Sequence, residues 1–464
     1  MKVEQIYTGC LAQGAYYIQS AGEAAIIDPL REVAPYIQAA QKDGVEIKYI
    51  FETHFHADFV SGHVTLAEKT GATIIYGPNA TPSFKAHIAQ DGAVFKVGKV
   101  FIKVLHTPGH TMESSTFLLA DENGKETAIF TGDTLFLGDV GRPDLAQKAA
   151  HLTQEQLAAI LFDSLRNKIM PLPDDVIVYP GHGAGSACGK NMMKETVDTL
   201  GNQKIMNYAL RADMTKEEFV KEVTDGLLPP PGYFPLNVKL NKEGYESIDT
   251  ILAEGTKPLS PREFEVIANE TEALMLDVRS KTAYSEGHIP NSIFIGLSGS
   301  FAPWVGALIV DVQQPIILIT PEGKEEEAVT RLSRVGFDNT LGYLKGGIEA
   351  WKAAGKEIDT VSNIEATELD TTLKMVDVRK RSEFLSKHVL EAYNAPLSEL
   401  NQHLAALPKD TSFYVHCGSG YRSVIAASIL KSRGYHNLVD IKGGFKAIKN
   451  TTIPVSDYVC PSTL

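Results

Sequence analysis

The sequence predicts an α/β protein in which a mixed α/β sandwich is followed by two smaller, doubly wound α/β units. Three observations support this prediction. Strand and helix patterns alternate through the first half of the chain, and four of those strands end in His or Asp beside Gly or Pro. The second half contains an internal repeat of about one hundred residues, the size of one small domain.

Composition limits the classes of function. The 464 residues suffice for two to four domains, and 44% hydrophobic with 22% charged residues is typical of globular proteins. A net charge of −13 argues against nucleic-acid or membrane-surface partners. The four cysteines form no CxxC pair, so a disulfide framework is not expected. Free thiols and the lack of a signal core or a long apolar run predict a cytoplasmic protein.

The first part of the chain opens as an antiparallel meander and continues with alternating helices and strands. Glycines separate the β-branched and aromatic runs, and each predicted helix is closed by a glycine. Strands are expected over 3–8, 15–20, 24–28, 46–51 and 73–76, and helices over 33–42 and 64–69.

Potential metal ligands follow four predicted strands. The strand over 46–51 runs into 53–58, Thr-His-Phe-His-Ala-Asp, which contains His54, His56 and Asp58. Strands over 100–105, 127–131 and 176–179 run toward His110, Asp133 and His182. A solvated polar loop explains one such ending, but His and Asp are seldom buried without a partner. Four endings together predict a metal site.

This constellation resembles the metallo-β-lactamase superfamily over about the first half of the chain. The matching segments are 53–58 (THFHAD), 107–110 (TPGH), 131–133 (TGD) and 180–182 (PGH). The resemblance implies an αββα sandwich with the metal at the edge between its two sheets.

Phe59 bears on the number of metal ions. Two-metal hydrolases of the superfamily, such as glyoxalase II, carry a further histidine directly after the motif aspartate, where this chain has Phe59. A second site would keep only Asp58, Asp133 and His182. The resemblance therefore favours one metal without excluding two.

A longer stretch resembles one branch of the superfamily, the persulfide dioxygenases, through 107–111, 131–136 and 138–145. The resemblance implies one Fe(II) per chain, held by His54, His110 and Asp133. Two imidazoles and one carboxylate with open positions form the facial triad of non-haem iron oxygenases. On this interpretation His56, Asp58 and His182 orient the ligands and water.

Two further features lie near the predicted metal site. Arg142 and Asp144 correspond to the family's thiol-substrate region, although a structural ion pair is equally compatible with them. Cys188 lies in a Gly-rich loop just after His182, with a helix expected directly behind it. A redox or substrate-linked role is one interpretation. A small buried hydrophobe is the other.

The internal repeat divides the rest of the chain. Residues 274–279 match 374–379, and 344–348 match 441–445. Both copies resemble rhodanese domains through their Asp-Val-Arg, a following His and a late Gly-Gly. After a proline-rich arm over 228–235, we expect domains over 1–248, 258–356 and 362–464.

The two copies differ at the loop where chemistry would occur. In the second copy a strand over 412–416 runs into Cys417, a short Gly-rich loop, Arg422 and a helix over 424–433. Converging backbone N–H groups and Arg422 favour a thiolate that can carry a persulfide sulfur. The first copy has no Cys in its loop 320–327, which contains several Glu and is expected to be one residue shorter.

The resemblance to persulfide dioxygenase–rhodanese fusions implies oxidation of a small thiol persulfide by dioxygen to sulfite, with Cys417 forming thiosulfate, in sulfide detoxification. A dinuclear zinc thioester hydrolase of the glyoxalase II kind is the alternative. A non-catalytic sulfur-binding scaffold is a third hypothesis. The identity of the thiol, the order of steps, the role of the Cys-less copy and a homo-oligomeric state stay open.

Overall fold

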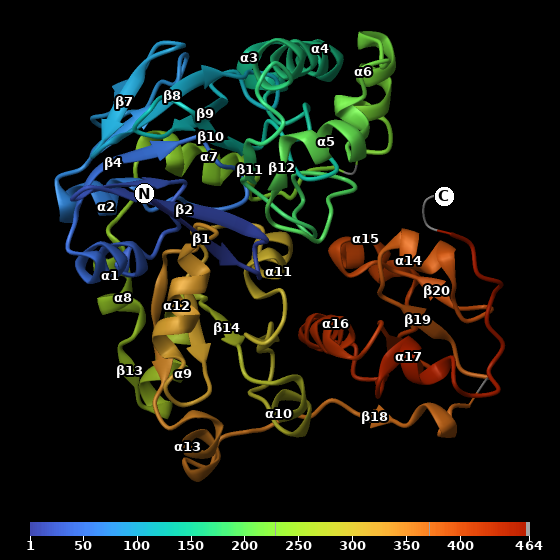
Figure 1. Cartoon of the computed structure of the whole chain (residues 1–464). Coiled ribbons are helices and arrows are strands. Elements are labelled where there is room, and N and C mark those ends of the chain that lie inside the picture. The colour runs from blue at the N-terminus through green and yellow to red at the C-terminus, as the bar shows by residue number, and fades with distance from the viewer. Residues whose placement is uncertain (228, 371, 461–464) are drawn as a thin grey trace. The chain divides into compact units, whose positions relative to one another are not determined.

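The computed structural model describes residues 1–227, 229–370 and 372–460 (Figure 1). Two compact units make up the chain. The first comprises Met1–Thr250 together with Leu332–Phe337, and the second comprises Ile251–Arg331 and Asp338–Leu464. In the described part, no helix combines the length and the apolar character that crossing a bilayer requires.

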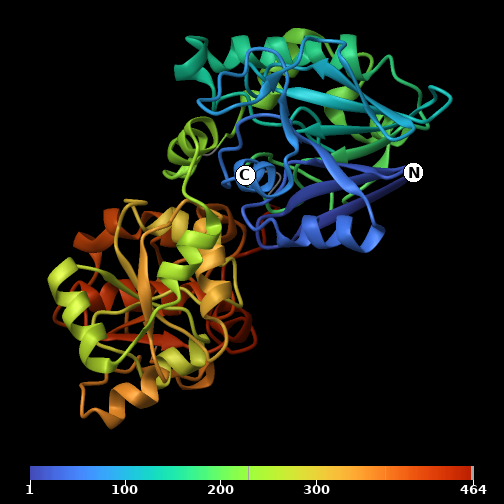
Figure 2. The same cartoon turned by 90° about the vertical axis from the view of Figure 1, so that its left-hand side faces the viewer.

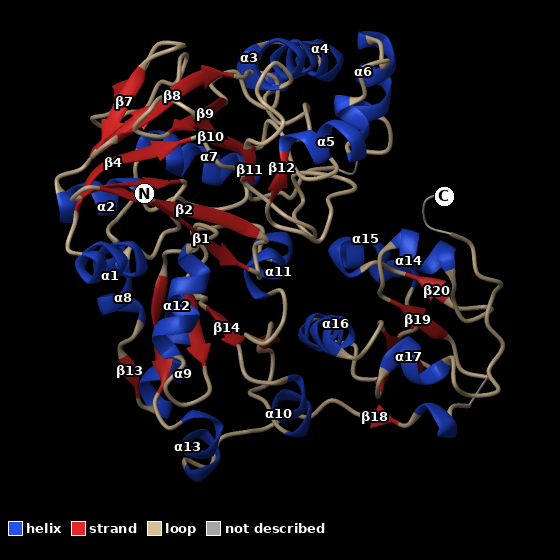
Figure 3. Ribbon diagram, in the orientation of Figure 1, coloured by secondary structure: helices blue, strands red, loops and turns tan. Residues whose placement is uncertain are grey.

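Two six-stranded mixed sheets form the centre of the first unit (Figure 3). One has the order β1-β2-β3-β4-β5-β6 and the other β12-β11-β10-β9-β8-β7. The strands of the first are β1 Lys2–Thr8, β2 Gln13–Ser20, β3 Glu23–Ile27, β4 Glu46–Glu52, β5 Thr73–Tyr76 and β6 His87–Ile88. Those of the second are β7 Val94–Val97, β8 Val100–His106, β9 Ser115–Ala120, β10 Glu126–Gly132, β11 Ile177–Pro180 and β12 Asp198–Thr199.

Helices cover the outer faces of both sheets. They are α1 Ala34–Asp43, α2 His63–Thr70, α3 Gln147–Ala150, α4 Gln154–Ser164, α5 Leu200–Met206, α6 Lys216–Thr224 and α7 Phe234–Glu243, with α8 Ile248–Gly255 leading into the second unit. A π-helical turn, Leu165–Ile169, extends α4, and a 3₁₀ turn, Tyr208–Leu210, follows α5.

Alternation along the strands builds the four layers. Tyr17 of β2 packs in a core with Tyr36 of α1, whereas the adjacent Tyr16 packs in a core with Phe130 of the other sheet. Successive side chains of a strand point to opposite faces, so each sheet buries both of its faces. Figure 2 shows the sheets between the blue helix α1 and the blue-green helix α4. The expected αββα sandwich is confirmed.

Two local expectations for this unit are wrong. No helix follows Cys188, because the backbone N–H groups of Lys190 and Asn191 donate to the Asp139 carboxylate and the next helix, α5, starts at Leu200. The arm expected over 228–235 does not stay extended. Its first residue lies outside the described part, and α7 begins at Phe234 with a proline in its first turn, where no N–H is needed.

The second unit contains two five-stranded parallel sheets, ordered β13-β17-β16-β14-β15 and β18-β22-β21-β19-β20. The strands of the first are β13 Pro258–Leu259, β14 Leu274–Asp277, β15 Ile293–Phe294, β16 Ile316–Ile319 and β17 Thr340–Leu344. Those of the second are β18 Asn363–Ile364, β19 Met375–Asp377, β20 Tyr393–Asn394, β21 Phe413–His416 and β22 Leu438–Ile441. The identical strand order confirms the two repeated α/β domains.

Helices connect these parallel strands, as crossover connections require. The first sheet has α9 Pro261–Thr271, α10 Lys281–Glu286, α11 Phe301–Leu308, α12 Glu325–Ser333 and α13 Gly347–Ala353. The second has α14 Arg381–Ser386, α15 Leu400–His403, α16 Tyr421–Ser432 and α17 Gly444–Ile448, with 3₁₀ turns Ala366–Glu368, Leu397–Glu399 and Leu404–Ala406. The last four residues of the domain expected over 362–464 lie outside the described part.

The register of the sheets aligns the two loops residue by residue. Asp277 pairs with Ile319 in the first copy, and Asp377 pairs with His416 in the second. Thr320 therefore takes the place of Cys417. A left-handed glycine lies three residues further on in both loops, with φ of 75° in the first and 95° in the second. The expectation of a shorter first loop is thus wrong, because α12 begins five residues after Thr320, whereas α16 begins four residues after Cys417.

Candidate functional site

Three strand ends of the first unit bring His54, His110 and Asp133 together. These residues follow β4, β8 and β10, and each is at most 2% exposed. The Nε2 atoms of His54 and His110 lie 4.0 and 3.5 Å from Asp133 Oδ2. One ligand atom from each residue thus lies within 4.8 Å of the others, as the shell around a single ion requires.

Hydrogen bonds orient both imidazoles. The Thr53 hydroxyl donates to Asp28 Oδ2 at 2.8 Å, so its lone pairs face His54 Nδ1 at 3.0 Å and accept that N–H. His110 Nδ1 lies 2.8 Å from the carbonyl oxygen of Arg142 and donates to it. Since each Nδ1 carries the proton, each Nε2 presents a lone pair to Asp133. This is how ligating histidines are commonly held.

The charges of the three residues match the needs of a cation. Burial, with the nearby His56, lowers the pKa of His54 well below its usual range and keeps that imidazole neutral. Burial opposes ionisation of Asp133, but the adjacent His182 holds the pKa of this carboxyl well below its usual range. Asp133 Oδ2 is buried and accepts no hydrogen bond from any described residue. The donor set therefore fits one divalent metal ion.

His182 connects Asp133 to Asp58. Its Nδ1 is hydrogen-bonded to Asp133 Oδ1 at 2.8 Å, and its Nε2 lies 2.8 Å from Asp58 Oδ2. Burial alone would lower the pKa of His182, but the two carboxylates raise it well above the usual value. The imidazolium fixes Asp133 Oδ1 and leaves Oδ2 facing the two histidines.

The His56 ring lies 4.2 Å from the His54 ring, but its Nε2 faces a different pair of carboxylates. Its Nε2 is 3.1 Å from Asp28 Oδ1 and 3.5 Å from Glu52 Oε2, and all three side chains are buried. Burial and the neighbouring Asp28 raise the pKa of Glu52 well above its usual range. The Phe59 ring packs against the His56 ring at 4.3 Å. Asp28 and Glu52 were not among the predicted site residues, although their places at the ends of β3 and β4 were a usable signal.

Arg142 and Asp144 form a buried ion pair. Arg142 Nε and Nη2 donate to the two Asp144 oxygens at 2.6 and 2.7 Å, and Nη1 donates to the Ala187 carbonyl at 3.2 Å. Because the Arg142 backbone also holds His110, the pair lies directly behind a candidate ligand.

Cys188 is 1% exposed and groups with Asp58 and His182. Burial, with the charges of Asp58 and Asp133, raises its pKa well above the usual value for a thiol. This thiol is therefore protonated near neutral pH. The interpretation that a helix N-terminus favours its thiolate fails, because no helix begins there.

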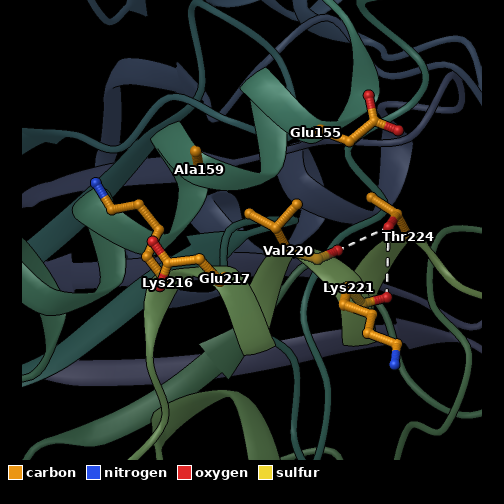
Figure 4. A pocket seen from close by; sticks show the side chains of 7 residues that line it. All are labelled: Glu155, Ala159, Lys216, Glu217, Val220, Lys221 and Thr224. Atoms are coloured by element: carbon orange, nitrogen blue, oxygen red, sulfur yellow. Dashed lines mark hydrogen bonds between the residues drawn. The ribbon is translucent and has the colours of Figure 1, made fainter.

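A separate hollow of about 460 Å³ lies between α4 and α6 (Figure 4). Its lining consists of Glu155, Ala159, Lys216, Glu217, Val220, Lys221 and Thr224. None of the predicted site residues is among them, and four charged side chains of mixed sign give it the character of a solvated surface groove.

The second candidate centre is the loop between β21 and α16. Cys417 follows the last residue of β21 and is 1% exposed. The backbone N–H of Gly420 donates to Cys417 Sγ at 3.1 Å. Such a donor stabilises a thiolate or a terminal persulfide sulfur.

Arg422 is held by a residue that the sequence analysis missed. Its Nη1 and Nη2 donate to Glu383 of α14 at 2.5 and 2.9 Å. That pairing raises the pKa of Arg422, and Arg422 in turn lowers the pKa of Glu383 against the effect of burial. Arg422 is therefore oriented by a bidentate partner beside the Cys417 loop.

Comparison with known proteins agrees with both halves of this description. The Metallo-beta-lactamase superfamily model matches residues 8–182, and the Rhodanese-like domain model matches 260–354 and 362–451.

Individual relatives match mainly the first unit. The chain is 30% identical over 221 residues to "Persulfide dioxygenase ETHE1, mitochondrial" of Homo sapiens, covering 47% of this chain and 78% of that protein. It is 34% identical over 163 residues to a "Probable hydroxyacylglutathione hydrolase" of Schizosaccharomyces pombe, covering 34% of this chain and only 59% of that protein.

One solved structure extends the similarity further along the chain. A crystal structure of a metallo-beta-lactamase from Staphylococcus aureus subsp. aureus COL is 33% identical, with a TM-score of 0.65. The match covers 74% of this chain and 98% of that one.

Proposed function

Because this chain belongs to the metallo-β-lactamase superfamily and carries two rhodanese-like domains, we propose that it is a persulfide dioxygenase coupled to sulfur transfer. Its substrates are a low-molecular-weight thiol persulfide and dioxygen, its products are the thiol and sulfite, and Cys417 converts sulfite into thiosulfate. The observation that supports this best is that one chain carries both a two-histidine, one-carboxylate group and a thiol at a persulfide-type loop.

The dioxygenase reaction balances without a further reductant. A persulfide RSSH, dioxygen and water give the thiol RSH and sulfurous acid, which ionises to sulfite. The outer sulfur loses four electrons, dioxygen accepts them, and water provides the third oxygen of sulfite. A bound Fe(II) supplies the redox chemistry and the open coordination positions for substrate and dioxygen.

The residues of the first unit hold and shape that site. His54, His110 and Asp133 would hold the ion, since each offers one ligand atom within 4.8 Å of the other two. Charged His182 holds Asp133 in place from behind. Phe59 is fully buried and offers an aromatic face where a two-metal hydrolase needs an imidazole.

The second centre moves sulfur by displacement at Cys417. The Cys417 thiolate attacks the outer sulfur of a second RSSH, whose S–S bond breaks to release the thiol RSH. The resulting Cys417 persulfide, Cys–S–S⁻, is attacked at its outer sulfur by the sulfur lone pair of sulfite. The S–S bond breaks, thiosulfate leaves, and the electron pair of the broken bond stays on Cys417 as a thiolate. The Gly420 N–H accommodates negative charge on Cys417 Sγ.

A second candidate is a thioester hydrolase with two zinc ions, with an accessory rhodanese. Similarity to hydroxyacylglutathione hydrolases favours it, as does a second set of possible ligands formed by Asp58, His182 and Cys188. The third possible ligand of this set is the Cys188 thiol, since Phe59 offers none. However, this function leaves the Cys417 loop without a role.

Metal content and oxygen uptake separate the two candidates. The purified full chain should contain about one iron and consume dioxygen when a thiol persulfide is added, with sulfite or thiosulfate as product. A panel of persulfides, including those of glutathione and coenzyme A, identifies the thiol. Two zinc ions per chain with cleavage of a glutathione thioester and no oxygen uptake would contradict the proposal.

A further inference from the structure

The loop that carries Cys417 is contacted by the copy that lacks a cysteine. Apart from Leu332–Phe337, both copies belong to the same compact unit, and α10 of the first packs against α16 of the second (Figure 1). Lys281, the first residue of α10, donates from Nζ to the carbonyl oxygen of Ser419 at 2.6 Å. Ser419 lies two residues after Cys417 in the candidate sulfur-transfer loop.

Lys281 and Cys417 bind opposite ends of one peptide group. The C=O of Ser419 accepts from Lys281, and the N–H of the same peptide, on Gly420, donates to Cys417 Sγ at 3.1 Å. A peptide group is planar and trans, so its C=O and N–H point in opposite directions. When Lys281 binds the Ser419 carbonyl oxygen, the Gly420 N–H therefore points toward Cys417 Sγ. A charged donor on the oxygen also polarises the peptide and strengthens its N–H as a donor.

Gly420 fits this arrangement and no larger residue would. Its φ of 95° lies in the left-handed region, and a Cβ at this position would come within 2.9 Å of Lys281 Nζ. The glycine thus permits both the turn of the loop and the approach of the ammonium group.

Other contacts join the second copy to the first copy and to the segment between them without touching this peptide. The Tyr421 hydroxyl donates to the Gly296 carbonyl at 2.7 Å, and the Phe294 N–H donates to the Ser428 hydroxyl at 3.0 Å. Lys431 of α16 forms an ion pair with Asp359 at 3.0 Å. Lys431, which makes no contact with this peptide, is therefore a matched control for Lys281, which does.

We propose that Lys281 is a positioning residue for Cys417, through which the Cys-less copy activates the sulfur-transfer loop of its neighbour. Lys281 orients and polarises the Ser419–Gly420 peptide and so stabilises negative charge on Cys417 Sγ. Two ion pairs lie beside the loop, Arg422 of α16 with Glu383 of α14, and Arg379 with Asp377 of β19. Further titratable groups there are His416, directly before Cys417, and Asp440 of β22, which lies near Lys281. The inference rests on the proposed role of Cys417, but its test does not require sulfur transfer.

The test measures how fast Cys417 is alkylated by iodoacetamide in the full chain between pH 5 and 10, followed on the Cys417 peptide by mass spectrometry. Lys281→Met should slow alkylation near pH 7 by about threefold to tenfold and move the rate profile to higher pH, since the loop then stabilises negative charge on Cys417 Sγ less well. Lys281→Arg should restore most of the rate. Lys431→Met, the matched control, should match the wild type, and melting curves verify that all variants are folded.

A thiosulfate–cyanide assay adds a second readout. Lys281→Met should lower kcat with little change in KM for thiosulfate, because Lys281 acts through the peptide. Unchanged alkylation in Lys281→Met, or equal losses in Lys281→Met and Lys431→Met, would overturn the inference. So would a rise in KM alone, which would make Lys281 an anion ligand. If the wild type transfers no sulfur while Lys281→Met still slows alkylation, the proposed function fails and the inference stands.

Discussion

The Thr53 hydroxyl accepts a hydrogen bond from His54 Nδ1 at 3.0 Å. The same hydroxyl donates its own proton to Asp28 Oδ2. This arrangement leaves His54 a single tautomer, with Nε2 free to bind a cation. Asp28 also accepts the Thr53 backbone N–H at 2.8 Å. The end of β3 thus determines how the first histidine after β4 is oriented.

Thr53→Val removes this control with little change in side-chain volume. We expect the affinity for Fe(II) to fall about 10-fold to 100-fold, because partners behind a ligand fix its orientation and basicity. Competition with a chelator, followed by metal analysis, measures the change. Thr53→Ser retains the hydroxyl and should stay close to the wild type. Equal affinities for the Val and Ser variants would show that the hydroxyl does not orient His54.

Phe59→His tests whether the lack of a histidine at this position limits the site to one metal ion. Phe59 is fully buried and packs against His56 in the same unit that contains Asp58, Asp133 and His182. In protein loaded with zinc in place of iron, adding an imidazole should raise the zinc content from about one toward two ions per chain, measured by mass spectrometry of the metal. Phe59→Leu is the control for lost aromatic packing. A folded Phe59→His variant with unchanged zinc content would mean that Phe59 does not limit the second site.

Cys417→Ser should change the product without stopping oxygen uptake. A hydroxyl cannot carry a persulfide sulfur, so the dioxygenase unit should release sulfite in place of thiosulfate. Ion chromatography of the products during persulfide oxidation measures their ratio. Cys460→Ser replaces an exposed thiol and serves as the control. Continued thiosulfate formation in the Cys417 variant would disprove the role of this residue.

Asp440 makes the stability of the second unit depend on pH. Burial raises the pKa of this carboxyl to about 7. In the unfolded chain the value is about 4, so the folded state binds the proton more tightly. The resulting stabilisation is fully present below pH 4 and is lost as the pH rises through 7. Three pKa units correspond to at most about 4 kcal/mol.

An asparagine at position 440 cannot ionise, so the Asp440→Asn variant should not lose stability as the pH rises through 7. The melting temperature of the variant relative to the wild type should increase from pH 5 to pH 8, measured by scanning fluorimetry. Asp410→Asn, at an exposed position, should show no such trend. A difference between Asp440→Asn and the wild type that does not vary with pH would show that Asp440 is already ionised throughout this range.

Much of the fold followed from local patterns. Strand alternation and glycine punctuation predicted the meander, the strand before His54 and the two repeated domains, because each pattern acts within a few residues. The prediction of a helix after Cys188 was wrong because a residue distant in the sequence controls this segment. Its backbone N–H groups are taken by Asp139, about fifty residues earlier in the chain, and no local pattern contains that information.

The sequence by itself determined which residues were available for chemistry, including the three strand-end residues His54, His110 and Asp133 and the cysteine Cys417 of the second repeat. Their positions after strands with strong patterns made their grouping predictable. The tertiary structure alone decided that His56 turns toward Asp28 and Glu52, and that Arg422 is held by Glu383. It also brought Lys281 to the Cys417 loop. These pairings join residues from 4 to 138 positions apart, and only packing of the folded chain sets such distances.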